Sequence, residues 1–141
     1  MTGPGSNVPS VRSFRAHPSA LHSVREFVRD QGAEVGLPSI LVDDLLIAVS
    51  EACANALLHT NSSQVRVMWQ TDGDAVAVEV RDEGVFKRHV PSADPNAVGG
   101  HGIPLMIAVM DEVTFIEGTP ARPGTVVRLV RRMDTLEQAS R

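Results

Sequence analysis

Apolar residues recur at two different spacings along the chain, and the longer spacing marks helices. Between residues 18 and 32 they recur every three or four positions among charged residues, which predicts an amphipathic helix that Gly32 and Gly36 end. Residues 39–60 are apolar at most positions and predict a long central helix. A short helix is expected to begin with the Ile-Pro pair at 103–104, because proline fits the first turn of a helix.

The shorter spacing marks strands. Apolar and polar side chains alternate in residues 65–70 and 76–82, and the Asp-Gly sequence between these stretches predicts a β-hairpin. Further strands are expected at 11–15, 113–117 and 124–131. This order of elements predicts an α/β fold of the α+β type, a two-layer sandwich in which an antiparallel or mixed sheet carries helices on one face.

The chain has 141 residues, which is enough for one domain with its own core. We expect this domain over residues 11–132. A disordered segment rich in Gly, Pro and Ser is expected at 1–10, and a flexible polar tail at 133–141. Aromatic residues make up only 4% of the chain, so the core must be built from Val, Leu, Ile and Ala.

Charge and hydropathy narrow the range of functions. The formal net charge is −4, which argues against a protein that binds nucleic acid directly through a basic face. No apolar run approaches the length of a membrane span and no signal segment opens the chain, so the expected compartment is the cytoplasm. The single cysteine, Cys53, cannot form an internal disulfide and is expected to pack as a small hydrophobe.

Polar residues at a spacing of four mark one face of the long helix. Glu51, Asn55 and His59 lie close to one line along it. The amide oxygen of Asn55 suits Mg²⁺, which prefers hard oxygen ligands and combines well with nucleotide phosphates. A carboxylate one turn away, at Glu51, can activate a hydroxyl or a water. The same pattern also fits a solvated helix edge, and we interpret His59 as a residue that interacts with the helix C-terminus.

Candidate base-binding residues follow at two strand ends. Asp82 ends the second hairpin strand, where its carboxylate can accept a hydrogen bond from an exocyclic amine such as that of adenine. Gly84 has no side chain to block a flat ring. Thr125 opens the last strand after Gly124, and its hydroxyl can reach a base directly or through water. Each of these features, taken alone, also fits an ordinary strand end.

A connection without clear periodicity runs over residues 84–102, which is typical of a functional loop in a compact domain. Gly99, Gly100 and Gly102 close it, immediately before the short helix. Glycine-rich backbone can turn several N–H groups towards one point, and the helix N-terminus adds partial positive charge, so this segment can bind an anion. A flexible linker is the alternative at this point.

The order of these motifs resembles the GHKL ATPase superfamily, whose nucleotide-binding domain has the Bergerat fold. The order is Glu-x-x-x-Asn on a helix, Asp-x-Gly after a hairpin, Gly-x-Gly before a short helix and Gly-Thr on a strand. Within the superfamily the chain is most similar to the small serine-protein kinases of bacteria that act as anti-sigma factors. The sequences Val-Ser-Glu-Ala at 49–52 and Met-Asp-Glu-Val at 110–113 carry this closer likeness, which spans about residues 11–131.

The resemblance implies a site for ATP and Mg²⁺, with a role for each matched residue. Glu51 would be the general base that acts on a substrate hydroxyl, and Asn55 would ligate Mg²⁺. Asp82 would hold the adenine amine, with Gly84 beneath the ring. The remaining matched residues would line the phosphates (Gly100, Gly102) or support the adenine (Thr125).

The resemblance also implies partners. The protein would sequester a sigma factor, phosphorylate an anti-anti-sigma antagonist protein on Ser or Thr, and form a homodimer. Two departures from the family pattern bear on turnover. Phe86 stands where many relatives have the second glycine of Asp-x-Gly-x-Gly, and residues 90–99 contain no Lys or Arg to stabilise the γ-phosphate.

These departures keep a second hypothesis open. The chain would then be a catalytically weak or inactive nucleotide-binding module that acts in transcription regulation through protein contacts. A detached catalytic domain of a sensor histidine kinase ranks last. The region before the long helix is too short for the helix pair that bears the phospho-accepting histidine in such kinases.

Overall fold

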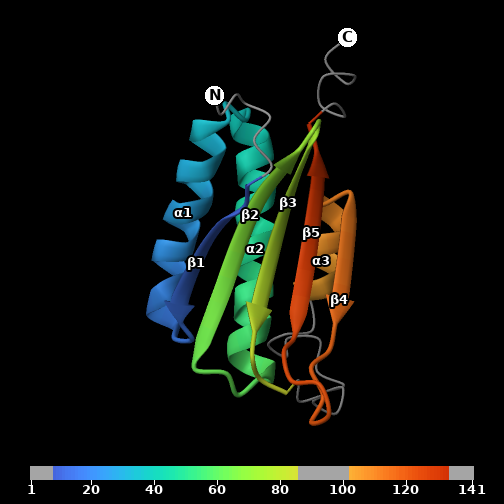
Figure 1. Ribbon diagram of the computed structural model, residues 1–141. Helices are drawn as coiled ribbons and strands as arrows, with labels where there is room; N and C mark the ends of the chain where they lie inside the picture. Colours follow the sequence, from blue (N-terminus) through green and yellow to red (C-terminus); the bar gives the residue numbers. More distant parts are fainter. Residues whose placement is uncertain (1–7, 86–101, 134–141) are drawn as a thin grey trace.

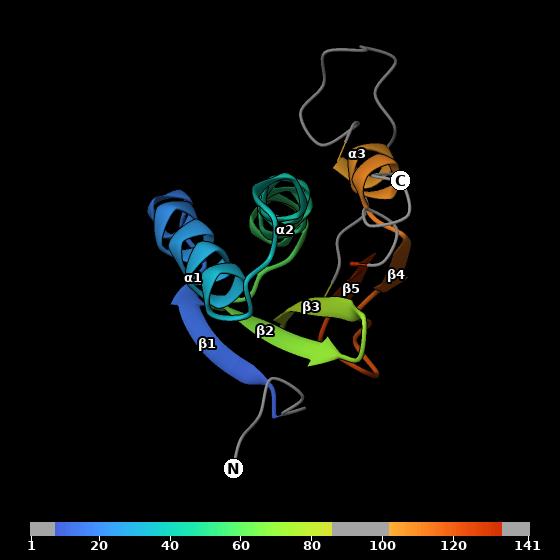
Figure 2. The ribbon, with the colours of Figure 1, turned by 90° about the horizontal axis from the view of Figure 1, so that it is seen from above.

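The computed structural model describes residues 8–85 and 102–133, which form two layers (Figure 1). The helices lie together on one face of a single sheet (Figure 2). Along the chain the elements are β1 (Ser10–Arg15), a 3-10 turn (Pro18–Ala20), α1 (Leu21–Glu34), α2 (Ser39–His59), β2 (Gln64–Asp72), β3 (Ala75–Asp82), α3 (Gly102–Val109), β4 (Glu112–Ile116) and β5 (Val126–Arg132).

The strand order in the sheet is β1-β2-β3-β5-β4, and each neighbouring pair is antiparallel. The predicted two-layer α+β sandwich is therefore confirmed, with a sheet that is antiparallel rather than mixed. β3 and β4 run in the same direction on either side of α3 in the sequence, but β5 lies between them in the sheet. The connection from β3 through α3 to β4 therefore does not create a parallel pair, because β5 lies between the two strands.

The end of α1 differs from the prediction because one of the two glycines lies within the helix. Gly32 belongs to α1, where a Cβ would lie 2.9 Å from Cγ2 of Val42 on α2, so close helix packing accounts for it. Gly36 adopts a left-handed φ of 73° after the helix. The N–H of Gly36 donates to the Ala33 carbonyl and that of Leu37 to the Gly32 carbonyl, a Schellman motif that ends α1.

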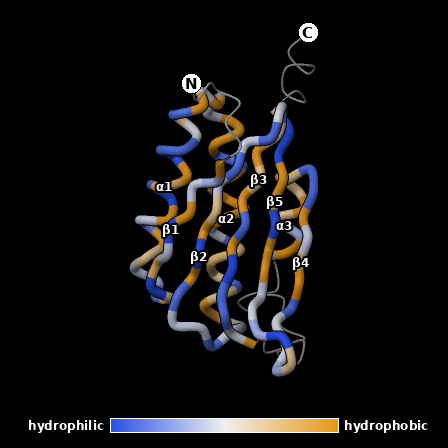
Figure 3. Tube along the Cα trace, in the orientation of Figure 1, coloured by the Kyte–Doolittle hydropathy of each residue, from blue (hydrophilic) through white to orange (hydrophobic). Residues whose placement is uncertain are grey.

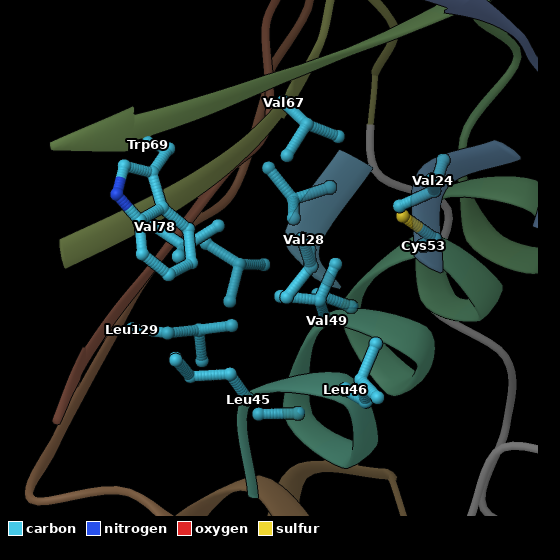
Figure 4. Packing of buried hydrophobic residues seen from close by; sticks show 14 of the residues in the cluster. Val24, Val28, Leu45, Leu46, Val49, Cys53, Val67, Trp69, Val78 and Leu129 are labelled. Carbon is cyan, nitrogen blue, oxygen red and sulfur yellow. The ribbon is translucent and has the colours of Figure 1, made fainter. Parts of the chain in front are cut away.

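The core lies between the sheet and the helices. Hydrophobic and hydrophilic residues alternate along β2 and the second half of β3 (Figure 3), and the buried row of valines and Trp69 faces the helices. Figure 4 shows Trp69 and Val78 of the sheet packed with Leu45 and Val49 of α2. α2 is apolar around much of its circumference because it contacts the sheet, α1 and α3. No helix among the described residues is long and apolar enough to cross a bilayer.

The direction of the elements brings separate segments to one end of the sandwich. α2 and β3 both end there, and β5 begins there (Figure 1). The backbone N–H of Asp82 donates to the Thr125 carbonyl over 3.0 Å, which extends the β3–β5 pairing to this end. Segments that carry the predicted site residues therefore converge in space.

Candidate functional site

Asp82 lies at the end of β3, on the face of the sheet that packs against the helices. Alternate residues of a strand point the same way, so Asp82 continues the buried row of Val76, Val78 and Val80. The residue is only 3% exposed. Because an isolated charge in such a row would be strongly destabilising, a buried carboxylate here requires specific partners.

The partners of Asp82 come from several segments. The Gly84 N–H donates to Oδ1 over 2.8 Å. Thr60 lines the same pocket, and its hydroxyl donates to the Ala56 carbonyl over 2.7 Å. Burial raises the pKa of Asp82 above its ordinary value, although hydrogen bonds from Gly84, Thr125 and Thr60 act in the opposite direction. The result is a poorly solvated acceptor that retains lone pairs for a further donor.

A pocket with about 220 Å³ of empty space, part of it open to solvent, lies beside this carboxylate. Most of its walls are apolar. α2, β3, β4, β5 and the residues that adjoin them supply the lining: Ala52, Asn55, Ala56, Thr60, Val80, Asp82, Phe115, Thr125 and Val127.

The periodicity of α2 places Asn55 and Glu51 as the sequence predicted. Asn55 is 6% exposed and lines the pocket. Glu51 lies four residues earlier, about 6 Å along the axis, and is partly exposed outside the pocket lining. The structure thus brings Asn55, Asp82 and Thr125 around one pocket, with Glu51 beside it.

Thr125 is held by hydrogen bonds to its hydroxyl and to its carbonyl. Its hydroxyl oxygen accepts the Gly118 N–H over 3.0 Å, and its carbonyl accepts the Asp82 N–H. The hydroxyl proton remains available for donation, because the bond from Gly118 occupies only a lone pair. Thr125 is 4% exposed and lines the pocket directly after Gly124, whose φ of 114° permits the sharp entry into β5.

The structure shows a second reason for glycine at position 84, besides the room it leaves for a flat ring. A Cβ here would lie 2.6 Å from Oδ1 of Asn61 and 2.9 Å from the backbone nitrogens of Asn61 and Ser62. The turn after α2 therefore packs directly against Gly84. Asn61 Oδ1 also accepts the Val85 N–H over 3.1 Å, which fixes the chain as it leaves β3.

Sequence reasoning missed several residues that build the pocket. Thr60 follows the end of α2, where no periodic pattern marks it as part of a site. Phe115 was predicted only as a strand residue, yet its register opposite the buried Val127 puts it on the helix-facing side. Gly118 lies against the Gly84 carbonyl oxygen and Gly124, so the close approach of these loops excludes a side chain.

Part of the predicted phosphate and lid region lies outside the described residues. This applies to Gly100, Phe86 and residues 90–99, as well as most of the segment at 1–10 and of the tail at 133–141. Gly102 is the first residue of α3, so the helix begins one residue before the Ile-Pro pair that was expected to start it. Within the described residues, no group of His, Cys, Asp and Glu side chains is placed to hold a metal ion.

Known protein families and sequences match most of this chain. A family model described as a histidine kinase-like ATPase domain matches residues 14–131. The serine-protein kinase RsbW of Bacillus velezensis is 32% identical over an alignment that covers 70% of this chain and 71% of the relative. RsbW of Bacillus subtilis is 31% identical with the same coverage.

Solved structures show the same fold. The RsbU and RsbW domains of Rv1364c from Mycobacterium tuberculosis match with a TM-score of 0.69 and 23% identity over 89% of this chain. The chain spans about a third of that structure, 32% of its length. The histidine kinase domain of the blue-light activated kinase EL346 from Erythrobacter litoralis matches with a TM-score of 0.53 and 16% identity, covering 98% of this chain and 68% of that structure.

Proposed function

The chain belongs to the family of histidine kinase-like ATPase domains, and from this premise we propose that it is an ATP-dependent serine/threonine protein kinase of the anti-sigma type. Family membership supports binding of ATP, and relatives that cover two thirds or more of the chain are serine-protein kinases. The proposal depends above all on the pocket that Asn55, Asp82 and Thr125 share at one end of the sandwich.

The residues that line the pocket support a site for the base of the nucleotide. Asp82 would accept a hydrogen bond from the exocyclic amine of adenine, since Gly84 occupies only part of the capacity of Oδ1. Apolar walls that include Val80 and Phe115 suit the faces and edges of a flat ring. The hydroxyl proton of Thr125 would be donated to a ring nitrogen, directly or through water.

Asn55 lies at the same pocket and would provide an amide oxygen to Mg²⁺. This ion demands near-octahedral oxygen coordination and usually takes its other ligands from waters and substrate phosphates, so one amide from the protein is a sufficient contribution. Bound Mg²⁺ supplies charge neutralisation at the phosphates. We propose that Gly100 and Gly102 add backbone N–H groups to the same phosphates.

Glu51 would act as the general base. It would accept the proton of a substrate Ser or Thr hydroxyl as that oxygen bonds to the γ-phosphorus and the bond to the ADP oxygen breaks. Its partial exposure, one turn from Asn55, leaves it accessible to a protein substrate. Phe86 and the absence of Lys and Arg from residues 90–99 remove common aids to this transfer, so we expect slow turnover.

The partners follow from the motif resemblance. We propose that the protein restrains a sigma factor in the cytoplasm, phosphorylates an anti-anti-sigma antagonist and forms a homodimer, with no direct contact to nucleic acid or membrane. Sedimentation equilibrium of the wild-type chain tests the dimer. Affinity capture from the native host with and without MgATP tests the two protein partners.

Replacement of the general base tests the catalytic assignment. Glu51→Gln keeps the size and polarity of the side chain but removes its basicity, so we expect labelled phosphate transfer from ATP to the antagonist to fall by about 10²–10⁴-fold. Calorimetric affinity for MgADP should stay within about twofold, because Glu51 lies outside the pocket lining. A variant that transfers as much label as the wild type contradicts the assignment.

The second candidate function is a nucleotide-binding interaction module without turnover. The residues at 86 and 90–99 favour it, since they lack the glycine and the basic side chains that support phosphoryl transfer. The same assay separates the two functions. A wild type that binds MgATP and its protein partner but transfers no label supports the module.

A further inference from the structure

The turn between α2 and β2 holds the chain that leaves β3, and the proposed function gives this turn no role. Oδ1 of Asn61 accepts the Val85 N–H over 3.1 Å, and Oγ of Ser62 accepts the Glu83 N–H over 3.2 Å. Between these two bonds lies Gly84, where a Cβ would stand 2.9 Å from the backbone nitrogens of both turn residues. Three consecutive residues after β3 are thus attached to this turn.

Gly84, the middle residue of the three, connects this loop to the pocket. Its N–H donates to Oδ1 of Asp82 over 2.8 Å, and its carbonyl accepts the Gly124 N–H over 3.0 Å, directly before Thr125 of the pocket lining. Glycine has more backbone conformations open to it than any other residue, so its own dihedral angles do not fix these two bonds. The anchors on either side of Gly84 restrict this freedom.

The bond from Val85 to Asn61 is an exposed one. Water competes for exposed donors and acceptors, so such a bond contributes little to the stability of the whole fold. Its main effect is therefore local, on the loop that presents Gly84 to the pocket. Asn61 is a better probe of this effect than Ser62, because Oγ of Ser62 also donates to the Gln64 carbonyl over 2.6 Å within its own turn.

We propose that Asn61 is a positioning residue that holds the loop at 83–85 and, through the Gly84 N–H, fixes the acceptor at Asp82 for the exocyclic amine of adenine. The inference rests on the proposed function. Asn61 lies outside the pocket lining, so it would act through Gly84 and not by contact with the nucleotide. A loop that is already ordered makes binding of the base less costly in entropy.

A pair of ligands separates this role from a merely structural one. ADP carries the exocyclic amine, whereas the 6-unsubstituted purine ribonucleoside diphosphate lacks it and is otherwise alike. Asn61→Ala removes the acceptor of the Val85 N–H and keeps the backbone of the turn. In calorimetry of the full chain with Mg²⁺ present, we expect it to weaken ADP binding about fivefold, in the range of one neutral hydrogen bond. Affinity for the analogue should stay within about twofold, because it makes no bond to the carboxylate.

Asn61→Asp is the matched control, since a carboxylate oxygen at the same place still accepts the Val85 N–H. Its affinity for ADP should stay within about twofold of the wild type. If Asn61→Ala does not unfold cooperatively in urea, Asn61→Ser, whose oxygen is held closer to the backbone, takes its place with the same two ligands. Equal losses for ADP and the analogue, or no loss for ADP, overturn the role of Asn61 alone. A wild type that binds neither ligand overturns the proposed function and this role with it.

Discussion

Burial of the Asp82 carboxylate lowers the stability of the fold, although the same carboxylate is proposed to bind the base. Its pKa in the folded protein lies above the ordinary value of 3.8, mainly because of desolvation, so the native state holds the proton to higher pH than the unfolded chain does. The free energy of unfolding therefore falls as pH rises from near 3.8 through the raised pKa, and stays at the lower level above it.

Asp82→Asn removes this ionisation and can still accept the Gly84 N–H. We expect the stability of the variant relative to the wild type to increase over the same pH range and to be greatest at neutral pH, as measured by urea unfolding at a series of pH values. Affinity for ADP should fall at least about tenfold, because an amide can present its donor side to the adenine amine. A relative stability that decreases with rising pH contradicts burial as the dominant cause.

Site residues differed in how far the sequence could reveal them. Asn55 and Asp82 stand at positions with a clear period, a helix face and a strand end, so their convergence followed once both elements were placed. Thr60 could not be predicted, because its place in the pocket lining depends on how the chain turns after α2. Gly84 was predicted for the right position, but the packing of Asn61 against it is a tertiary contact.

On the scale of the elements, the loops at the end of the sandwich that carries the pocket pack with their backbones in close contact. Gly84→Ala would put a Cβ 2.6 Å from Asn61 Oδ1 and 2.9 Å from backbone nitrogens that cannot move freely. We expect it to lower the free energy of unfolding by about 1–3 kcal/mol, as overpacking does. Urea denaturation measures this, and nucleotide affinity should fall too because Gly84 orients Asp82.

Gly36→Asn provides the control for that substitution. Gly36 has a positive φ of 73° but no atom within 4 Å of an added Cβ, and asparagine tolerates this backbone region. We expect a loss below about 1 kcal/mol. If both variants lose the same stability, crowding at the loop is not the cause.

The strands themselves were predictable from alternation, and each lies within about two residues of its expected place, the usual uncertainty of an element boundary. Their order in the sheet was not. Insertion of β5 between β3 and β4 depends on long-range pairing such as Val80 with Val127, to which no local pattern points. The prediction therefore left open whether the sheet was antiparallel or mixed.

On the scale of the whole molecule, ion pairs join the two layers of the sandwich at the end opposite the pocket. Arg131 of β5 reaches Asp44 of α2 at 3.3 Å and Asp111, just before β4, at 3.2 Å, and its side chain is only 16% exposed. The backbone N–H of Arg132 also donates to Asp111. The cluster joins both layers of the sandwich far from the proposed chemistry.

Arg131→Met keeps the apolar stem and leaves two partly buried carboxylates without their shared cation. We expect a loss of about 1–3 kcal/mol in the free energy of unfolding, below the cost for a fully buried pair, with ADP affinity unchanged within about twofold. Arg132→Met is the control, since its contact with Glu112 spans 4.0 Å between exposed side chains and is expected to contribute under about 0.5 kcal/mol. Similar losses for both variants would contradict the role of the cluster.

Cys53 allows opening of the domain to be measured on the unsubstituted chain. It is the single cysteine, 3% exposed in the core, and burial raises the pKa of its thiol to about 12. A reagent that consumes thiolate can therefore reach it only during transient opening of the domain. If that opening is global, ADP at one hundred times its dissociation constant should slow the modification about 100-fold. An affinity for nucleotide could thus be read from a reaction rate, with no dye or substitution introduced.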